Sequence, residues 1–128
     1  MTTGVILNKE DIIYQQIIAI ASSYGIFDCI PCARAIKEFL IRQNIHGKHI
    51  KINTNSQDPI YGRIYNDSIG ELIATTGHHE GVIIEINDGE LVFDNIHHQG
   101  ITRLNWIQNL YSPILDAGLE FQITETYF

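Results

Sequence analysis

The sequence predicts an α+β fold in which helices come first and an antiparallel sheet follows. In the first third of the chain, apolar residues recur at spacings of three and four, as on one face of a helix. Residues 82–94 instead form two short β-type runs on either side of Asn87-Asp88-Gly89, which is a hairpin signature. Helices followed by antiparallel strands are typical of the α+β class.

The whole chain, 1–128, is predicted to form a single domain. Its 128 residues suit one hydrophobic core, and 45% hydrophobic with 18% charged residues is an ordinary globular composition. No block rich in Pro, in Gly and Ser or in charges of one sign divides the chain, and no internal repeat is found.

Two helices are expected at the start of the chain. Asp11 is predicted to cap the first helix, and Gly25 suits its end. After a short loop, 26–30, the fixed φ of Pro31 suits the first position of the second helix, which ends near Asn44.

The second half of the chain supplies the strands. A strand is expected at 49–53, and 68–75 is predicted to be a short helix capped by its first residue. After the hairpin, 103–110 reads as a helix around Trp106, which is interpreted as a core residue, and 119–124 as a last strand.

The net charge of the chain and the distribution of its basic residues indicate which classes of partner it can bind. The formal net charge is −7, and the 8 Lys and Arg residues are scattered, whereas nucleic-acid binding needs them clustered. We therefore predict no nucleic-acid partner. No apolar run is long enough for a signal peptide or a membrane span, so we also predict no membrane association and a cytoplasmic location.

The strongest chemical signal is a cysteine at a predicted helix start. A thiol is nucleophilic as a thiolate, and the first turn of a helix favours negative charge there. If the second helix begins at Pro31, Cys32 lies in its first turn and Cys29 lies outside the helix. Cys32 is therefore the preferred nucleophile, and Cys29 is kept as the alternative.

A base and an orienting residue follow from the hairpin. His79 comes just before a strand, and a two-residue turn at Asn87-Asp88 places Asp94 opposite Gly81, diagonal to His79 and within hydrogen-bonding reach. A three-residue loop would bring Asn95 to the histidine instead. The two-residue register is supported because it gathers five apolar residues on one face: Val82, Ile84, Ile86, Leu91 and Phe93.

Three segments together resemble a known family. Residues 27–33 (FDCIPCA), 79–82 (HEGV) and 92–95 (VFDN) are similar to the papain-fold toxin domains of bacterial polymorphic toxin systems. These belong to the papain-like and transglutaminase-like superfamily, with Cys at a helix start, His opening a strand and Asp or Asn on the next strand. The resemblance covers roughly residues 24–106.

The resemblance implies a papain-like fold and a thiol hydrolase that needs no cofactor or metal. The substrate would be an amide, either a peptide or isopeptide bond or a glutamine side chain, so protease and deamidase both stay open. Cys32 would be the nucleophile, His79 the base and Asp94 the orienting residue. A protein substrate or an immunity-type protein partner is expected, and export as an effector by a non-classical route is the alternative to a cytoplasmic location.

The family's oxyanion-binding glutamine has no clear match here. Gln15 and Gln16 lie too far before the cysteines to be assigned. The backbone N–H of Cys32 is the expected oxyanion donor, together with a second, unidentified group.

Three other interpretations use the same residues. The spacing of Cys29 and Cys32 permits a reversible disulfide that would switch the nucleophile off. The pair would also complete a zinc site with two histidines from 78–79 and 97–98, although adjacent histidines on a strand point to opposite faces. Finally, a non-catalytic binding module that keeps the papain-like scaffold is the alternative to an enzyme.

Overall fold

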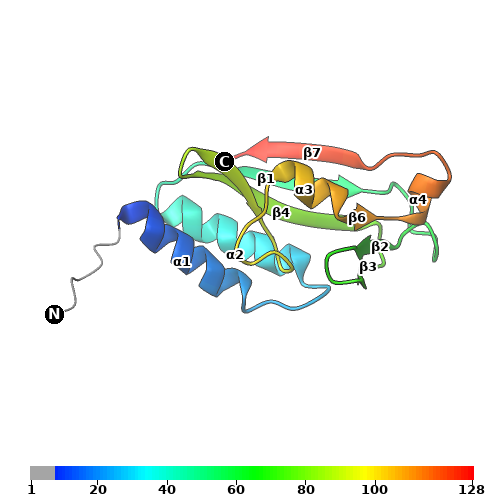
Figure 1. Ribbon diagram of the computed structural model, residues 1–128, viewed down its shortest axis with the longest axis horizontal. Coiled ribbons are helices and arrows are strands. Elements are labelled where there is room, and N and C mark those ends of the chain that lie inside the picture. Colours follow the sequence, from blue (N-terminus) through cyan, green and yellow to red (C-terminus); the bar gives the residue numbers. More distant parts are fainter. Residues whose placement is uncertain (1–7) are drawn as a thin grey trace.

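The structure is a computed structural model that describes residues 8–128, and it combines four helices with seven strands in that range (Figure 1). The elements in chain order are α1 (Lys9–Ala21), α2 (Cys29–Arg42), β1 (Lys48–Asn53), β2 (Ile64–Asn66), β3 (Glu71–Ala74), β4 (His78–Ile86), β5 (Gly89–Phe93), α3 (Arg103–Gln108), β6 (Leu110–Tyr111), α4 (Pro113–Asp116) and β7 (Gln122–Tyr127). This confirms the predicted α+β class.

The main sheet separates two hydrophobic cores. Its strands follow the order β5-β4-β1-β7, all antiparallel, and α1 and α2 lie side by side beneath it in Figure 1. One core joins these helices to the sheet through residues such as Ile36 and Val82. The other core joins Ile83 and Ile52 to Trp106 of α3, and it also packs against the small sheet β3-β2-β6.

The hairpin of β4 and β5 has the predicted register. Val82 pairs with Phe93 and Ile86 with Gly89, so Asn87-Asp88 is a two-residue turn in which both residues have positive φ, 51° and 65°. The five predicted apolar residues all belong to or pack against the helix-side core. The same register continues to bring Gly81 and Asp94 together. A Cβ at Gly81 would lie 2.9 Å from the Phe93 carbonyl oxygen, so this close approach needs glycine.

The start of α2 differs from the prediction in a way that matters for the site. Asp28 is the N-cap, Cys29 is the first helical residue and Pro31 is the third. Proline is tolerated at any position whose N–H has no acceptor inside the helix, and that condition covers the whole first turn. The expectation that Pro31 opens the helix and that Cys29 lies outside it is therefore wrong.

Other boundaries also differ. Asn8 caps α1 and shares a capping box with Asp11, so Asp11 is the third helical residue and not the cap. The helix ends at Ala21, before Gly25 is reached. The predicted helix at 68–75 is wrong, because its second half is strand β3, which pairs with β2 after a turn.

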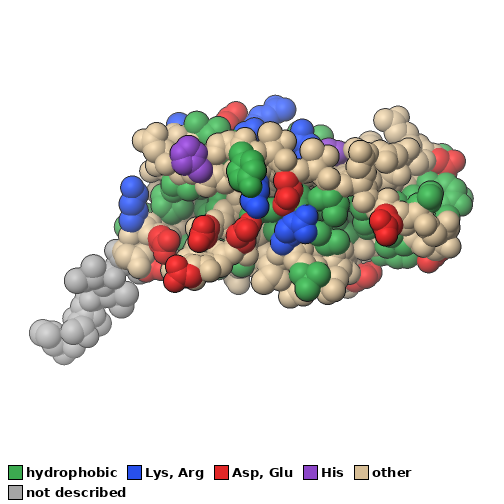
Figure 2. All heavy atoms as spheres, turned by 90° about the horizontal axis from the view of Figure 1, so that it is seen from above, with side chains coloured by type: hydrophobic (Ala, Val, Ile, Leu, Met, Phe, Trp, Pro, Cys, Tyr) green, Lys and Arg blue, Asp and Glu red, His purple; other side chains and the backbone are tan. Residues whose placement is uncertain are grey.

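No helix within residues 8–128 combines the length and the apolar character that crossing a membrane requires. On the face seen in Figure 2, Lys and Arg side chains are interspersed with acidic ones and form no continuous stripe.

Candidate active site

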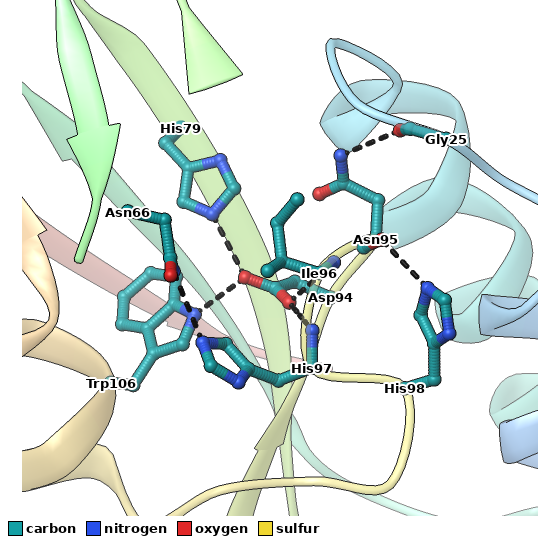
Figure 3. A network of polar contacts seen from close by, with 9 residues as sticks. All are labelled: Gly25, Asn66, His79, Asp94, Asn95, Ile96, His97, His98 and Trp106. Carbon is teal, nitrogen blue, oxygen red and sulfur yellow. Dashed lines mark hydrogen bonds and ion pairs between the residues drawn. The ribbon is translucent and has the colours of Figure 1, made fainter. Parts of the chain in front are cut away.

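The site is built around a buried histidine–aspartate pair. His79 comes from the second position of β4 and Asp94 directly follows β5, and both side chains are fully enclosed. The Nε2 of His79 lies 2.9 Å from Oδ2 of Asp94 (Figure 3). The contact predicted from the hairpin register is thus present.

Asp94 is held by donors from three directions. Besides His79, the indole Nε1 of Trp106 donates to Oδ2 at 2.6 Å, and the backbone N–H groups of Ile96 and His97 donate to Oδ1 at 2.9 and 2.6 Å. Burial alone would raise the pKa of Asp94, but the hydrogen bonds, first of all from His79, lower it to about 2. Asp94 is therefore a fixed carboxylate at neutral pH.

The His79 ring is oriented by this carboxylate and by an aromatic neighbour. It stacks on Trp106 with ring centroids 5.5 Å apart and 26° between the planes. Burial works to lower the pKa of His79, but the hydrogen bond to Asp94 and the nearby Cys29 side chain outweigh burial and raise the pKa to about 9. The other ring nitrogen, Nδ1, is buried without a hydrogen-bond partner in the described structure.

Cys29, and not Cys32, is the cysteine that affects the pKa of His79. It is the first residue of α2, its side chain is only 6% exposed, and after Asp94 it contributes to the raised pKa of His79. The first backbone N–H groups of a helix have no acceptor within the helix, and the Asp28 side chain does not cap them. Cys29 thus has the helix terminus and the link to His79 that the sequence analysis expected for Cys32.

Cys32 lies one turn further along and faces the core. It is completely buried among the residues of the helix-side core. Burial, followed by the charges of Asp94, Cys29 and Asp28, raises the pKa of the Cys32 thiol to about 12. Its backbone N–H donates to the Asp28 carbonyl oxygen at 3.1 Å, so the expected oxyanion donor is already engaged within the helix.

Asn95, the alternative orienting residue, is directed elsewhere. Its Nδ2 donates to the Gly25 carbonyl oxygen at 2.8 Å, and no hydrogen bond joins it to His79 (Figure 3). The register explains this result, because the two-residue turn places Asp94 and not Asn95 beside the histidine.

The remaining histidines have other partners, and the predicted zinc ligands are not gathered. Asn66 Nδ2 donates to Nε2 of His97, and His98 Nε2 contacts the Asn95 carbonyl oxygen at 2.7 Å. His78 is bound to Glu80. Among residues 8–128, no three His, Cys, Asp or Glu side chains are placed to hold a metal ion together.

Trp106 is the site residue that the sequence analysis placed only in the core. It is fully buried, as expected, but its indole N–H also binds the carboxylate of Asp94. The available signal was chemical, because a buried tryptophan N–H needs an acceptor and Asp94 is the nearest acid before it in the sequence.

An open hollow is lined by a chain neighbour of Cys29 and by a chain neighbour of His79. Its volume is about 460 Å³, and these two neighbours are Ile30 and His78. The other lining residues are all polar and uncharged: Asn53, Asn55, Ser56, Gln57 and Thr76. These side chains offer hydrogen-bond donors and acceptors but no charge.

Comparison with known proteins identifies the family. Residues 12–111 match the family described as papain fold toxin 2, and this range includes Cys29, His79 and Asp94. No curated protein and no solved structure gives a significant match to the chain. The match spans most of the sequence and agrees with the helices packed on an antiparallel sheet. The chain therefore belongs to the papain fold toxin 2 family and carries a papain-like toxin domain.

Proposed function

We propose that the protein is a cysteine hydrolase that cleaves an amide, with Cys29 as nucleophile, His79 as general base and acid, and Asp94 as orienting residue. One observation carries the proposal. Asp94 occupies Nε2 of His79 and leaves Nδ1 buried without a hydrogen-bond partner, and the Cys29 side chain helps to raise the pKa of this ring. This is the arrangement that a thiol, a base and an orienting acid need.

The proposed reaction follows from these positions. The Cys29 thiol gives its proton to Nδ1 of His79, and the thiolate attacks the carbonyl carbon of the amide. His79 then protonates the leaving nitrogen as the C–N bond breaks, which leaves a thioester on Cys29. Water, deprotonated by His79, attacks the thioester, releases the carboxylic acid and restores the thiol.

The charge on the oxyanion would be stabilised at the start of α2. The backbone N–H of Cys29 belongs to the uncapped first turn and faces no acceptor inside the helix. Pro31 has no N–H and that of Cys32 is engaged, so the first two residues of the helix are the proposed backbone donors.

The test is the pH dependence of alkylation by iodoacetamide between pH 5 and 9, with the modified cysteine identified by mass spectrometry. We expect Cys29 to react as a thiolate well below pH 8.5, roughly the pKa of a free thiol, and Cys32 to stay unmodified in the folded protein. Cys29→Ala should abolish the reaction, whereas Cys32→Ala should retain it. Reaction only at Cys32, or an ordinary thiol profile at Cys29, would overturn the assignment.

The proposed substrate is an amide, either a peptide bond or the side chain of a glutamine. Release of ammonia from protein glutamine and release of new N-termini from a denatured protein distinguish a deamidase from a protease. As a member of a toxin family, the protein is proposed to act on a protein, and an immunity-type partner that covers the hollow remains a prediction.

The burial of the site favours a second candidate. Cys29 is 6% exposed and His79 is fully enclosed. A non-catalytic binding module that retains the papain-like scaffold would keep these side chains closed off. It predicts that neither cysteine reacts with iodoacetamide at any pH at which the protein is folded.

A further inference from the structure

Two segments that are distant in the sequence meet beside the proposed nucleophile. The Nδ2 of Asn95, in the loop after β5, donates to the carbonyl oxygen of Gly25, in the loop before α2, at 2.8 Å (Figure 3). The two residues are 70 positions apart, and Asn95 is 3% exposed. The bond therefore connects the segment that carries Asp94, the proposed orienting residue, to the segment that carries Cys29, the proposed nucleophile.

A short chain of hydrogen bonds continues from Gly25 to the helix start. The Gly25 carbonyl oxygen also accepts the backbone N–H of Asp28 at 3.2 Å, and the Gly25 N–H donates to Oδ2 of Asp28 at 3.1 Å. Asp28 is the residue immediately before Cys29. Its carboxylate is used to hold Gly25, so the first N–H groups of α2 remain uncapped.

The loop between these two residues is strained. Phe27 has a positive φ of 73°, although it is not glycine, and its side chain is 57% exposed. A left-handed conformation at a bulky residue such as this one is destabilising and persists only where its surroundings impose it. The hydrogen bonds at Gly25 are suited to impose it.

Asn95 also carries an unusual cost of its own. Its Oδ1 is buried and has no hydrogen-bond partner in the described structure. A buried acceptor without a partner lowers the stability of the fold, and an apolar side chain of the same size would avoid this loss. The amide is thus present although it lowers stability. This indicates that the hydrogen bond donated by Nδ2 has a role other than stabilising the fold.

We propose that Asn95 is a positioning residue that holds Cys29 within reach of Nδ1 of His79. This inference rests on the proposed function, since it assigns a role to a residue that touches neither the reacting thiol nor the substrate. Without the Asn95 donor, the loop loses the bond that holds Gly25 and Phe27 relaxes. Cys29 then moves away from the imidazole and its thiol behaves as an ordinary one.

The test compares Asn95→Leu with Asn66→Leu. Asn66 is a matched control because it is equally buried, but its amide binds His97 and the backbone of Ile69, not Gly25. We expect Asn95→Leu to move the alkylation midpoint of Cys29 toward 8.5, roughly the free-thiol value, and to slow alkylation at pH 6 at least tenfold. Asn66→Leu should change the melting temperature but leave the midpoint in place.

The outcomes separate this inference from the proposed function. A folded Asn95→Leu variant with the wild-type midpoint would overturn the positioning role alone. An ordinary thiol profile in the wild type would overturn the proposed function itself. If Asn95→Leu does not fold, Asn95→Asp gives the same reading, because it keeps the shape of the side chain and replaces the donor with an acceptor.

Discussion

Strand β4 carries two neighbouring residues that belong to two different clusters of histidine and carboxylate, one fully buried and one partly buried. His79 binds Asp94 and stacks on Trp106. The next residue, Glu80, points away from this pair and binds Nε2 of His49 at 2.8 Å and Nε2 of His78. Alternation along the strand separates the two clusters.

The clusters are alike in their electrostatics and different in what they leave unpaired. Burial opposes ionisation of Glu80, but hydrogen bonds from His49 and His78 lower its pKa to about 2, as low as that of Asp94. Both nitrogens of His78 have partners, since Asn53 contacts Nδ1. Among the described histidines, His79 is the one with a fully buried ring nitrogen that has no hydrogen-bond partner, and the Cys29 side chain acts on its pKa. A strongly shifted pKa is therefore common to both clusters, and the buried nitrogen without a partner sets the proposed site apart.

The largest expected effect comes from removing one histidine from each of the two clusters and comparing the results. His79→Ala removes the proposed base and should lower the second-order rate of Cys29 alkylation at pH 6 about 100- to 10,000-fold, the range typical of a lost acid–base group. His78→Ala removes the neighbouring histidine of the other cluster, and we expect it to change this rate less than about threefold.

The measurement is the rate of Cys29 alkylation in the two variants. Circular dichroism is the control that both variants are folded like the wild type. An equal loss in both variants would mean that the Glu80 cluster also acts on the nucleophile. No loss in His79→Ala would remove the histidine from the mechanism.

The hairpin and its pairing are the part of the site that the sequence predicts well. A period-two pattern allows only one register that buries Val82 and Phe93 together, and Asn87-Asp88 fits the two-residue turn. Because register is a local property, the contact between His79 and Asp94 follows from it.

The identity of the cysteine beside His79 depends on a helix boundary that the sequence leaves ambiguous. Pro31 suits the first turn as a whole, and a shift of two positions exchanges the roles of Cys29 and Cys32. The bonds from Asn95 to Gly25 and from Trp106 to Asp94 join different elements, so no local pattern contains them. Only the packed fold brings those groups together.

A second prediction concerns stability at alkaline pH. The pKa of His79 is raised from 6.5 to about 9, so its interaction with Asp94 stabilises the fold fully below pH 6.5 and is lost as the pH rises through 9. The free energy of unfolding should fall over this range by at most about 3 kcal/mol, since one pKa unit corresponds to about 1.4 kcal/mol. Urea unfolding at pH 6.5 and at pH 9.5 measures the difference.

Two amide variants sharpen the comparison between the clusters. Asp94→Asn removes the charge that raises the pKa of His79, so most of the alkaline loss of stability should disappear. Glu80→Gln should leave that loss in place, because the lowered pKa of Glu80 acts in acid, where its contribution is lost as the pH falls through about 2. An unchanged alkaline slope in Asp94→Asn would assign the loss to another group.

The smallest expected effect concerns the aromatic support of the pair. Trp106→Phe keeps a ring against His79 but removes the donor that lies 2.6 Å from Oδ2 of Asp94. A hydrogen bond to a charged group contributes about 1.5–3 kcal/mol, so we expect a loss of this size in urea unfolding and a roughly tenfold slower alkylation at pH 6. Ile64→Val, a change in the same core, should cost about 0.5–1.5 kcal/mol without slowing alkylation. If Trp106→Phe lowers stability but does not slow alkylation, the indole contributes only to packing, and His79 and Asp94 hold their geometry without it.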